Sequence, residues 1–330
     1  MAKLRMAVVG MGMGGSYGAR IHKSPAAEFA AMCDLDAGRL KTRAELYKKE
    51  IGAEPKPYTS VDEMLAKEKL DGVVISTPSA THHTVAVKVA GAGVNLLIDK
   101  PIDISAENID KIESAVKKTG VLCGVNYPLR LSPLMNGAKK AITDGLLGKI
   151  LLCDVRMKWH RGQAYYDKGG WRGTWAMDGG GSLMNQGAHY MDLLCWFLGK
   201  PVSVTGEFAA LNHKIETEDW ASGTVAFEGG ARSTISTTTC VLPQIDTNWV
   251  EVHGTTGSIY MKAGGSEEIA SGVENLRTLA VPKFDYPVEE FIDAVAHKRP
   301  PLVSIEEARR SVNLINGIYR SAREGRRVAL

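Results

Sequence analysis

Cysteine is scarce in this 330-residue sequence, and the five cysteines that occur form no CxxC pair. Each lies among apolar neighbours, so the pattern argues against a framework of disulfides. We interpret them as small buried side chains of a protein in a reducing compartment, at Cys33, Cys123, Cys153, Cys195 and Cys240.

Long apolar runs and long basic blocks are also missing. No run approaches the roughly 18 apolar residues that a membrane span needs. The opening MAKLRMAVVG is soon interrupted by glycines, which predicts a strand and not a signal peptide. The net charge is only +3, and without a Lys or Arg block we expect neither nucleic acid nor a membrane as partner. A cytoplasmic protein is the expectation that follows.

The chain contains neither an internal repeat nor a low-complexity segment. Hydrophobic residues make up 44% and charged residues 23% of it, as in ordinary globular proteins. At roughly 150 residues per domain, the length predicts two domains that each bury a core.

The first part of the chain alternates strand and helix patterns. Apolar runs of strand length lie at Leu4–Val9, Glu28–Cys33, Gly72–Ser76, Val94–Ile98 and Val121–Val125. Helical periodicity lies between them at Gly15–Lys23, Ala37–Ile51, Val61–Lys67, Thr81–Ala92 and Ser105–Lys118. This alternation predicts parallel βαβ units in a doubly wound sheet.

After a predicted helix at Pro133–Asp144, long alternating stretches dominate. They are predicted as strands at Ile150–Trp159, Val202–Leu211, Ser222–Phe227, Ala231–Cys240, Trp249–Gly254 and Ser258–Met261. Turn-rich EGGA and HGTTGS separate several of them, which favours a mostly antiparallel sheet with one covered face. We therefore predict domains at 1–124 and 125–330, with a C-terminal helix over about 304–325 that packs back on the first domain.

A glycine-rich loop follows the first predicted strand. In VVGMGMGGSYG, Gly10, Gly12 and Gly15 match GxGxxG between a strand and a helix. Asp34 closes the second strand about 20 residues later, where a dinucleotide fold places its ribose-binding acid. A carboxylate there would repel a 2′-phosphate, and Leu35 and Asp36 supply no Arg to bind one. The loop therefore predicts NAD as cofactor in preference to NADP.

Two further stretches end predicted strands of the same sheet. STPSATH, at 76–82, and IDKP, at 98–101, both lie at the carboxyl edge, where ligands bind in such folds. Pro101 restricts Lys100 to an extended backbone and so fixes the direction of its side chain. Together the loops predict a cofactor site at Gly10, Gly12, Met13, Gly14, Gly15, Asp34, Ser76, Thr77, Pro78, His82, Asp99, Lys100 and Asn126.

The segment WHRGQAYYDKGGWRGTW is rich in aromatic and basic side chains. Flat aromatic faces beside hydrogen-bond donors suit a sugar ring, although about half of these residues could simply anchor a long loop. We predict substrate contacts at Tyr127, Arg130, Arg161, Tyr166, Trp171, Arg172, Gln186 and His189. The segment's two arginines could equally bind a carboxylate or a phosphate on the substrate.

Six motifs occur in order over essentially the whole chain: GMGMGG, STPSATH, DKP, NYPLRLSP, WRGTWAMDGGGSLMNQGAHYMDLLCWFLG and PPLVSIEEARRSVNLINGIYRSAREG. In this the sequence resembles the Gfo/Idh/MocA oxidoreductases of sugars and cyclitols. The resemblance implies a Rossmann domain followed by an α/β domain with a large, mostly antiparallel open sheet. It also implies a homodimer or homotetramer formed through that sheet. The family's usual EKP reads Asp99-Lys100-Pro101 here.

The resemblance also implies the catalytic residues. The Lys of the family motif is Lys100, the helical His is His189, and the family Asp four residues earlier is Asn185 here. Positions four apart share one face of a helix, so Asn185 and His189 can face the same substrate. We assign His189 as the base, because imidazole titrates near neutrality, and Lys100 as the donor that positions the hydroxyl oxygen. Asn185 would orient the substrate or the ring by hydrogen bonds.

The expected activity is hydride transfer between NAD and a secondary hydroxyl of a sugar, glycoside, nucleotide sugar or cyclitol. The stretch GGGSLMNQGAHYMDLL resembles that of family members that oxidise sugars or nucleotide sugars at C3, and this resemblance implies C3 of a hexose as the position. Two alternatives remain: a glycoside-cleaving enzyme that uses tightly bound NAD transiently, and a non-catalytic NAD(P)-binding regulator. A metal site that pairs His189 with Asp192 lacks a third ligand at metal spacing, so no metal is expected.

Overall fold

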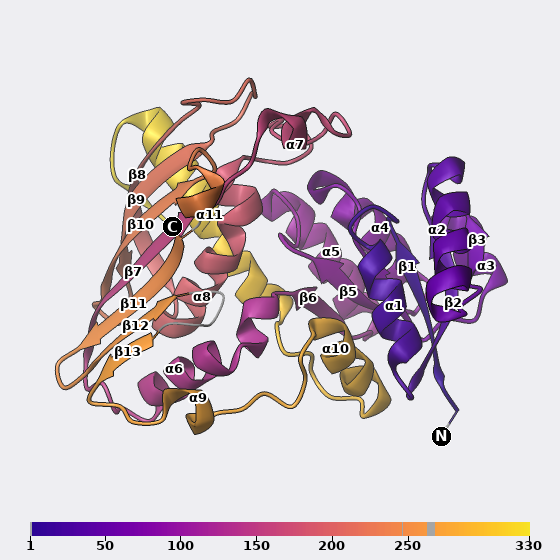
Figure 1. Ribbon diagram of the computed structural model, residues 1–330, viewed down its shortest axis with the longest axis horizontal. Helices are drawn as coiled ribbons and strands as arrows, with labels where there is room; N and C mark the ends of the chain where they lie inside the picture. The colour runs from indigo at the N-terminus through magenta and orange to yellow at the C-terminus, as the bar shows by residue number, and fades with distance from the viewer. Residues whose placement is uncertain (1, 246, 263–267) are drawn as a thin grey trace. The chain divides into compact units, whose positions relative to one another are not determined.

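The computed structural model describes residues 2–245, 247–262 and 268–330, and divides the chain into two compact units (Figure 1). The first unit comprises the chain up to Tyr127 together with Phe284–Ile305. The second comprises Pro128–Lys283 and Glu306–Leu330. Each unit is described by itself below, and the packing of the C-terminal helix on the first domain stays a prediction.

The first unit is built on a six-stranded sheet in which all strands are parallel. Its strand order is β3-β2-β1-β4-β5-β6, so the chain runs outward from β1 in both directions. The strands are β1 (Leu4–Val9), β2 (Ala27–Cys33), β3 (Lys56–Tyr58), β4 (Gly72–Ile75), β5 (Asn95–Asp99) and β6 (Cys123–Asn126). This is the predicted doubly wound sheet, with the short strand β3 added.

Helices connect the strands of the first unit: α1 (Gly15–Lys23), α2 (Ala37–Ile51), α3 (Val61–Lys67), α4 (His82–Gly91) and α5 (Ala106–Thr119), with a 3₁₀ turn (Ser79–Thr81) before α4. A further helix, α10 (Pro287–Ala296), comes from the later segment Phe284–Ile305. Local chemistry sets their ends: the Ser105 side chain caps α5 by accepting from the Asn108 N–H, and Gly120 ends it in the left-handed region. Phe291 and Ile292 of α10 are buried in one apolar core with Met6 and Val8 of β1.

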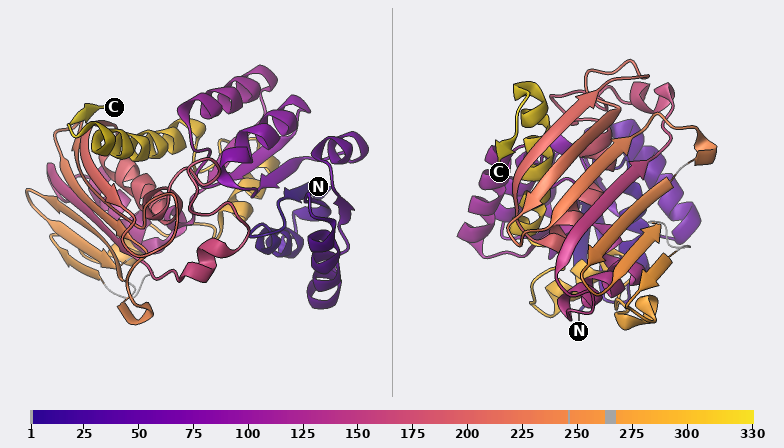
Figure 2. Two further views of the ribbon diagram at one scale, coloured as in Figure 1. Left: turned by 90° about the horizontal axis from the view of Figure 1, so that it is seen from above. Right: turned by 90° about the vertical axis from the view of Figure 1, so that its left-hand side faces the viewer.

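The second unit contains an eight-stranded sheet with the order β13-β12-β11-β7-β10-β9-β8-β14 (Figure 2, right). Only β7 and β10 pair in parallel, and the other neighbours are antiparallel. The strands are β7 (Ile150–Lys158), β8 (Pro201–Ala209), β9 (Trp220–Phe227), β10 (Arg232–Thr238), β11 (Thr247–Gly254), β12 (Ser258–Lys262), β13 (Glu268–Ser271) and β14 (Val328–Ala329). The prediction of a large, mostly antiparallel sheet is confirmed.

The second unit contains the helices α6 (Pro133–Thr143), α7 (Gln163–Asp167), α8 (Ala188–Leu198), α9 (Leu276–Leu279) and α11 (Ile305–Glu324), with 3₁₀ turns (Pro128–Leu131 and Pro243–Ile245) and a π-helical turn (Ser182–Gln186). Of these, α8 and α11 pack on one face of the sheet. On β7, Val155 is fully buried whereas Arg156 is exposed, as expected for a strand with one covered face. A Cβ on Gly206 of β8 would lie 2.6 Å from Cγ2 of Ile318, so glycine there lets α11 pack closely on the sheet.

The five cysteines are all free thiols. Cys33, Cys123, Cys153 and Cys195 are buried, and Cys240 is partly exposed. Burial raises the pKa of the Cys33 and Cys123 thiols to about 12. No helix in the described part of the chain combines the length and the apolar character needed to cross a bilayer.

Candidate active site

The loop between β1 and α1 leaves no room for a side chain at two of its glycines, Gly10 and Gly14. Gly10 has a φ of +95°, and a Cβ there would lie 2.3 Å from the carbonyl oxygen of Ser76. A Cβ on Gly14 would lie 2.0 Å from the carbonyl oxygen of Gly10. A Cβ on Gly12 would meet nothing within 4 Å. The loop therefore packs tightly at Gly10 and Gly14 and leaves open space at Gly12, which fits a pyrophosphate beside the start of a helix.

Asp34 follows β2 and lies beside this loop. Its Oδ2 accepts a hydrogen bond of 2.7 Å from the Met11 N–H, and Nη1 of Arg39 lies 3.0 Å from the same oxygen. Arg43, one turn further along α2, donates to the carbonyl oxygens of Met11 and Gly12 at 3.0 Å each. The sequence prediction considered only the residues directly after Asp34 and missed both arginines. Because Arg39 lies beside the acid that is predicted to bind the ribose, the local electrostatic potential depends on the pair and not on Asp34 alone.

Asp99, at the end of β5, joins the ends of β4 and β6 to helix α1. Its carboxylate accepts from the Tyr17 hydroxyl at 3.0 Å, from the Ser76 hydroxyl at 2.9 Å and from Nδ2 of Asn126 at 3.0 Å. Its Oδ1 also accepts from the backbone N–H of Lys100 at 2.9 Å. Burial, and then the charge of Asp99, raise the pKa of Tyr17, so this side chain stays a protonated donor. The shorter acid of the DKP motif thus positions the backbone of Lys100.

His82 is a buried residue that contacts the turns next to Ser76 and Asp99. It is 1% exposed, and its Nδ1 and Nε2 each lie 2.9 Å from a backbone carbonyl oxygen, of Pro101 and Thr77 respectively. Its ring therefore connects the STPSATH turn to the DKP turn. The structure thus gives the His82 ring a supporting role, and its predicted contact with the cofactor stays a prediction.

In the second unit, a π-helical turn precedes α8. The Gly187 N–H donates to the carbonyl oxygen of Ser182 at 2.7 Å, which gives this turn its wider spacing. The preceding glycines make room for close neighbours: a Cβ on Gly180 would lie 2.2 Å from the Tyr319 hydroxyl, and one on Gly181 would lie 1.8 Å from the carbonyl oxygen of Glu218. The sequence analysis had not foreseen which groups would pack there.

Glu218 fixes the start of this turn. Its fully buried carboxylate accepts from the N–H groups of Gly181 and Leu183 at 2.8 Å each, and from the Tyr319 hydroxyl at 3.0 Å. Burial raises the pKa of Glu218 to about 7, against the lowering effect of these donors. The carboxylate therefore takes the place of an N-cap for the segment that carries Asn185 and His189.

Asn185 and His189 are both partly exposed, in contrast to the buried residues around them. Nδ2 of Asn185 donates to Oδ1 of Asp178 at 2.8 Å, and Oδ2 of Asp178 accepts from the Gly173 N–H. The carboxylate that the family carries at position 185 is absent, but Asp178 places a carboxylate directly beside Asn185. No sequence spacing pointed to this residue.

Four predicted substrate contacts are buried in the protein: Tyr127, Arg130, Tyr166 and Gln186. Arg130 forms a buried ion pair with Asp192 and a partly buried one with Glu307. The Tyr166 hydroxyl pairs with Thr239 at 2.8 Å in a buried position. Within the second unit, Arg130 and Tyr166 thus have structural partners, and direct substrate contact by all four side chains stays a prediction. Arg161, Trp171, Arg172 and His189 are partly exposed, as a pocket wall requires.

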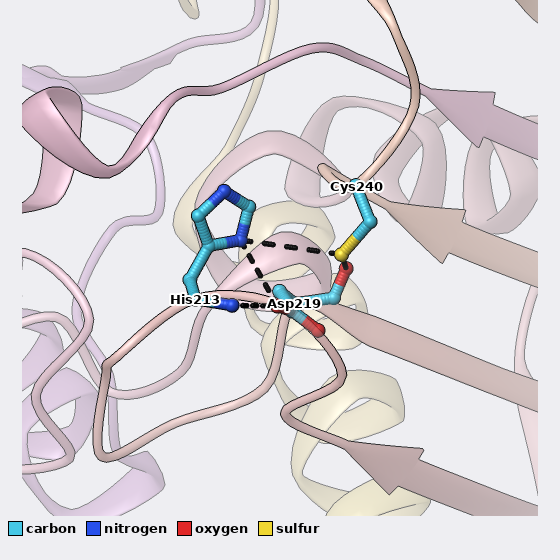
Figure 3. A group of neighbouring side chains, drawn as sticks. All are labelled: His213, Asp219 and Cys240. Atoms are coloured by element: carbon cyan, nitrogen blue, oxygen red, sulfur yellow. Dashed lines mark hydrogen bonds and ion pairs between the residues drawn. The ribbon is translucent and has the colours of Figure 1, made fainter.

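His213, Asp219 and Cys240 form a cluster at the ends of β9 and β10 (Figure 3). Nδ1 of His213 lies 2.9 Å from Oδ2 of Asp219, and Nε2 lies 2.6 Å from the carbonyl oxygen of Arg161. Both ring nitrogens of His213 are therefore within hydrogen-bond distance of protein oxygens. Burial also raises the pKa of the Cys240 thiol to about 11. The cluster fits a hydrogen-bonded loop anchor, and the expectation of no metal stays a prediction.

Two family models match the chain. One, described as an oxidoreductase family with an NAD-binding Rossmann fold, covers residues 4–127. The other, described as the GFO/IDH/MocA C-terminal domain, covers residues 135–260. The chain belongs to the Gfo/Idh/MocA family of oxidoreductases.

Relatives of known identity match over nearly the full length. The scyllo-inositol 2-dehydrogenase (NAD(+)) of Bacillus subtilis (strain 168) is 28% identical, over 96% of this chain and 92% of the relative. The WlbA dehydrogenase from Bordetella pertussis, solved in complex with NADH and UDP-GlcNAcA, has a TM-score of 0.89 at 28% identity and covers 99% of this chain and 98% of its own. A second WlbA structure, from Chromobactrium violaceum, has the same TM-score at 29% identity, over 99% and 96% of the two chains.

Membership of the Gfo/Idh/MocA family confirms four expectations from the sequence: the family, the fold class, an oxidoreductase activity and NAD as cofactor. The structure also brings together the loops that were predicted to hold NAD, since Ser76 lies against Gly10 and bonds to Asp99. The partly exposed or exposed members of that set are Gly12, Met13, Ser76, Thr77, Pro78, Asp99 and Lys100. Individual roles for these residues remain proposals.

Proposed function

We propose that this Gfo/Idh/MocA protein is an NAD-dependent dehydrogenase of a secondary hydroxyl group on a sugar, glycoside, nucleotide sugar or cyclitol, with C3 of a hexose as the favoured position. The observation that carries the proposal is the placement of His189. It is a partly exposed histidine near the start of α8, on a segment whose preceding turn is fixed by the buried carboxylate of Glu218. A side chain that titrates near neutrality, held on a rigid element, suits proton transfer.

The chain's own residues supply positioning and proton transfer. When bound, NAD supplies the acceptor for the electron pair of the substrate C–H bond. We assign His189 to remove the hydroxyl proton and Lys100 to donate a hydrogen bond to the same oxygen. Asn185, which Asp178 holds by a hydrogen bond of 2.8 Å, orients the substrate. Lys100 belongs to the first unit and His189 to the second, and each is placed by contacts within its own unit.

The relatives support this class of substrate. One is named for scyllo-inositol, another is the D-apiose dehydrogenase of Paraburkholderia graminis at 24% identity, and the WlbA structures were solved with UDP-GlcNAcA. Cyclitol, pentose and nucleotide-sugar partners share a ring or chain with several hydroxyl groups. The substrate class proposed for this chain is drawn from that shared feature.

The test is a panel of sugars, inositols and nucleotide sugars incubated with the protein and NAD, with NADH followed at 340 nm. The proposal expects NADH to form in proportion to the substrate consumed, and product analysis gives the oxidised carbon. Substrate consumption without net NADH would identify the glycoside-cleaving alternative instead. If no compound of the panel is consumed and no NADH forms, the proposed activity is contradicted.

Asp34 is expected to set the preference for NAD. The substitution Asp34→Asn removes the charge that repels a 2′-phosphate and releases the Arg39 guanidinium, 3.0 Å away, to bind that phosphate. The ratio of kcat/KM with NADP to that with NAD should rise by about tenfold or more. Asp36→Asn is the matched control, because the Asp36 side chain caps α2 and Asn caps equally well. An unchanged ratio in the Asp34 variant would contradict the assignment.

We also propose that the chain assembles as a homodimer or homotetramer through the open face of the second sheet. On that face the Trp249 and Tyr260 rings pack edge to face, with centroids 4.9 Å apart, and the Arg156 guanidinium lies over Trp249 at 5.8 Å. Aromatic and Arg side chains are enriched at protein interfaces. Light scattering should give two or four times the chain mass of 35.6 kDa, and a monomer would contradict the assembly.

A further inference from the structure

Two arginines of the segment 159–175 share one tyrosine ring. The guanidinium carbon of Arg161 lies 5.1 Å, and that of Arg172 lies 4.8 Å, from the centroid of Tyr165. Each arginine also lies over a tryptophan, Arg161 over Trp159 at 5.1 Å and Arg172 over Trp171 at 4.6 Å. Aromatic faces therefore hold two positive charges close together in the second unit.

These two charges lack a counterion within the described part of the chain. Arg161 donates to the carbonyl oxygen of its neighbour His160 at 2.7 Å, and Arg172 makes a long contact of 3.4 Å with that of Lys168. In the described residues neither guanidinium reaches a carboxylate, and the Nε of each is buried with no hydrogen-bond partner. A buried donor without a partner costs about 1 to 3 kcal/mol.

Two other enclosed arginines, Arg130 and Arg299, are paired with carboxylates. The guanidinium of Arg130 contacts both Asp192 and Glu307, and that of Arg299 contacts both Glu290 and Asp293. The nearby carboxylate of Asp178 is turned to Gly173 and Asn185 instead. Unlike Arg130 and Arg299, the two arginines around Tyr165 have no carboxylate partner among the described residues. They therefore form a candidate site for an anion that is not part of the chain.

The same cluster reaches the segment that carries the proposed base. Nε2 of Gln186 donates to the Tyr165 hydroxyl at 3.1 Å, and Gln186 is the last residue of the π-helical turn that precedes α8. Gln186 is 3% exposed, and its Oε1 is buried without a hydrogen-bond partner. The site thus presents unmet donors on the two arginines and an unmet acceptor on Gln186.

We propose that Arg161 and Arg172 bind an anionic group of the substrate, a carboxylate or a phosphate, while Oε1 of Gln186 accepts a hydrogen bond from a substrate hydroxyl. Arginine donors in a planar fork match the oxygens of either anion. The inference rests on the proposed function, because it concerns the substrate of that dehydrogenase. It narrows the substrate class from neutral sugars and cyclitols to sugar acids, sugar phosphates and nucleotide sugars.

The experiment compares matched neutral and anionic compounds. D-Glucose is paired with D-glucuronate and with D-glucose 6-phosphate, and UDP-glucose is included, each at saturating NAD. Binding is measured by calorimetry and turnover by NADH formation, for the wild type, Arg161→Gln, Arg172→Gln and Arg323→Gln. Arg323 is the matched control, because it also lies over a tryptophan ring, Trp175 at 4.8 Å, but is exposed on α11. Melting temperatures show whether each variant is folded.

The wild type should bind at least one anionic compound about tenfold or more tightly than its neutral partner. Arg161→Gln and Arg172→Gln should each weaken that binding by about tenfold or more and leave binding of the neutral compounds within about twofold. Arg323→Gln should change the binding of neither class of compound. Comparison of the glucuronate and phosphate arms identifies which anion the site takes.

Two results would overturn the inference: equal wild-type binding of neutral and anionic compounds, or equal anion binding in folded Arg161→Gln and Arg172→Gln. Failure of the proposed function gives a different result. If anionic compounds bind in an arginine-dependent way but no NADH or oxidised product forms, the anion site stands and the dehydrogenase proposal fails. If neutral sugars are oxidised and anions are not bound, the dehydrogenase proposal stands and the anion site fails.

Discussion

Replacing His189 with alanine should lower kcat by about 10²- to 10⁴-fold, the range typical of a lost general base. The hydroxyl proton of the substrate must leave as the C–H bond breaks, and without His189 no side chain of the π-helical turn or of the start of α8 has a suitable basicity. Added imidazole should restore part of the rate, because it can occupy the space left by the ring. The measurement is steady-state NADH formation with the best substrate of the panel, with and without imidazole.

The matched control for His189 is His253→Ala. His253 lies on β11, where its ring contacts Ser258 and Glu251, and it serves no proposed step. This variant should keep wild-type kcat and show no response to imidazole. Binding of NAD should be unchanged in both variants, since His189 belongs to the second unit and the cofactor loop to the first. Full activity of His189→Ala would remove His189 from the mechanism.

Lys100 should behave differently from His189. Lys100→Met removes a hydrogen-bond donor while leaving the proposed base in place, so kcat should fall but imidazole should not restore it. Lys100→Arg should retain part of the rate because it keeps a positive donor. These contrasts separate the base from the donor more clearly than the size of either loss.

Local patterns predicted the fold well because its elements follow short-range rules. The helices α1, α2 and α3 begin and end at the predicted residues, since glycine, Asp and Ser signals mark their boundaries. The strands β3, β13 and β14 were not predicted, and each has only two to four residues. A strand that short has too few positions to show an alternating pattern.

Only those residues of the candidate site that belong to a sequence motif could be predicted. The glycine loop, Asp34 and Lys100 stand at fixed spacings, and these could be found from the sequence. Glu218 and Tyr319 are 101 positions apart and meet at the buried carboxylate. Glu218 lies in ETED, a run that resembles an exposed acidic turn, so its burial could not be predicted. Contacts between distant segments depend on packing that no local pattern encodes.

The contacts of Arg130 also could not be predicted from local patterns. Here a residue that the sequence assigns to the site has structural partners. The sequence analysis placed it in the substrate pocket because it is basic and lies in a family motif. In the structure its Nε and Nη2 contact the two oxygens of Asp192 at 2.8 and 2.7 Å, and its Nη1 contacts Glu307 at 2.6 Å. Although burial opposes it, the charge of Asp192 together with that of Glu307 raises the pKa of Arg130 above its ordinary value.

Arg130→Met should therefore destabilise the second unit by about 3 to 5 kcal/mol, because it leaves the fully buried carboxylate of Asp192 without a partner. All six tryptophans lie in the second unit, so tryptophan fluorescence during urea unfolding reports on that unit alone. The midpoint should shift to lower urea. Arg310→Met, which removes an exposed pair with Glu306, is the matched control and should cost at most about 1 kcal/mol.

The double variant Arg130→Met/Asp192→Leu decides between the structural and the substrate-binding interpretation of Arg130. Replacing both buried charges by apolar side chains should recover most of the lost stability, since the cost lies in the unpaired carboxylate and not in the missing arginine. If Arg130 bound substrate instead, Arg130→Met would raise KM and leave the unfolding midpoint unchanged. In that case Asp192→Leu would add its own destabilisation without rescue. Recovery of the midpoint in the double variant is therefore the result that assigns Arg130 to the fold, where it joins α8 to α11 next to the turn that carries Asn185.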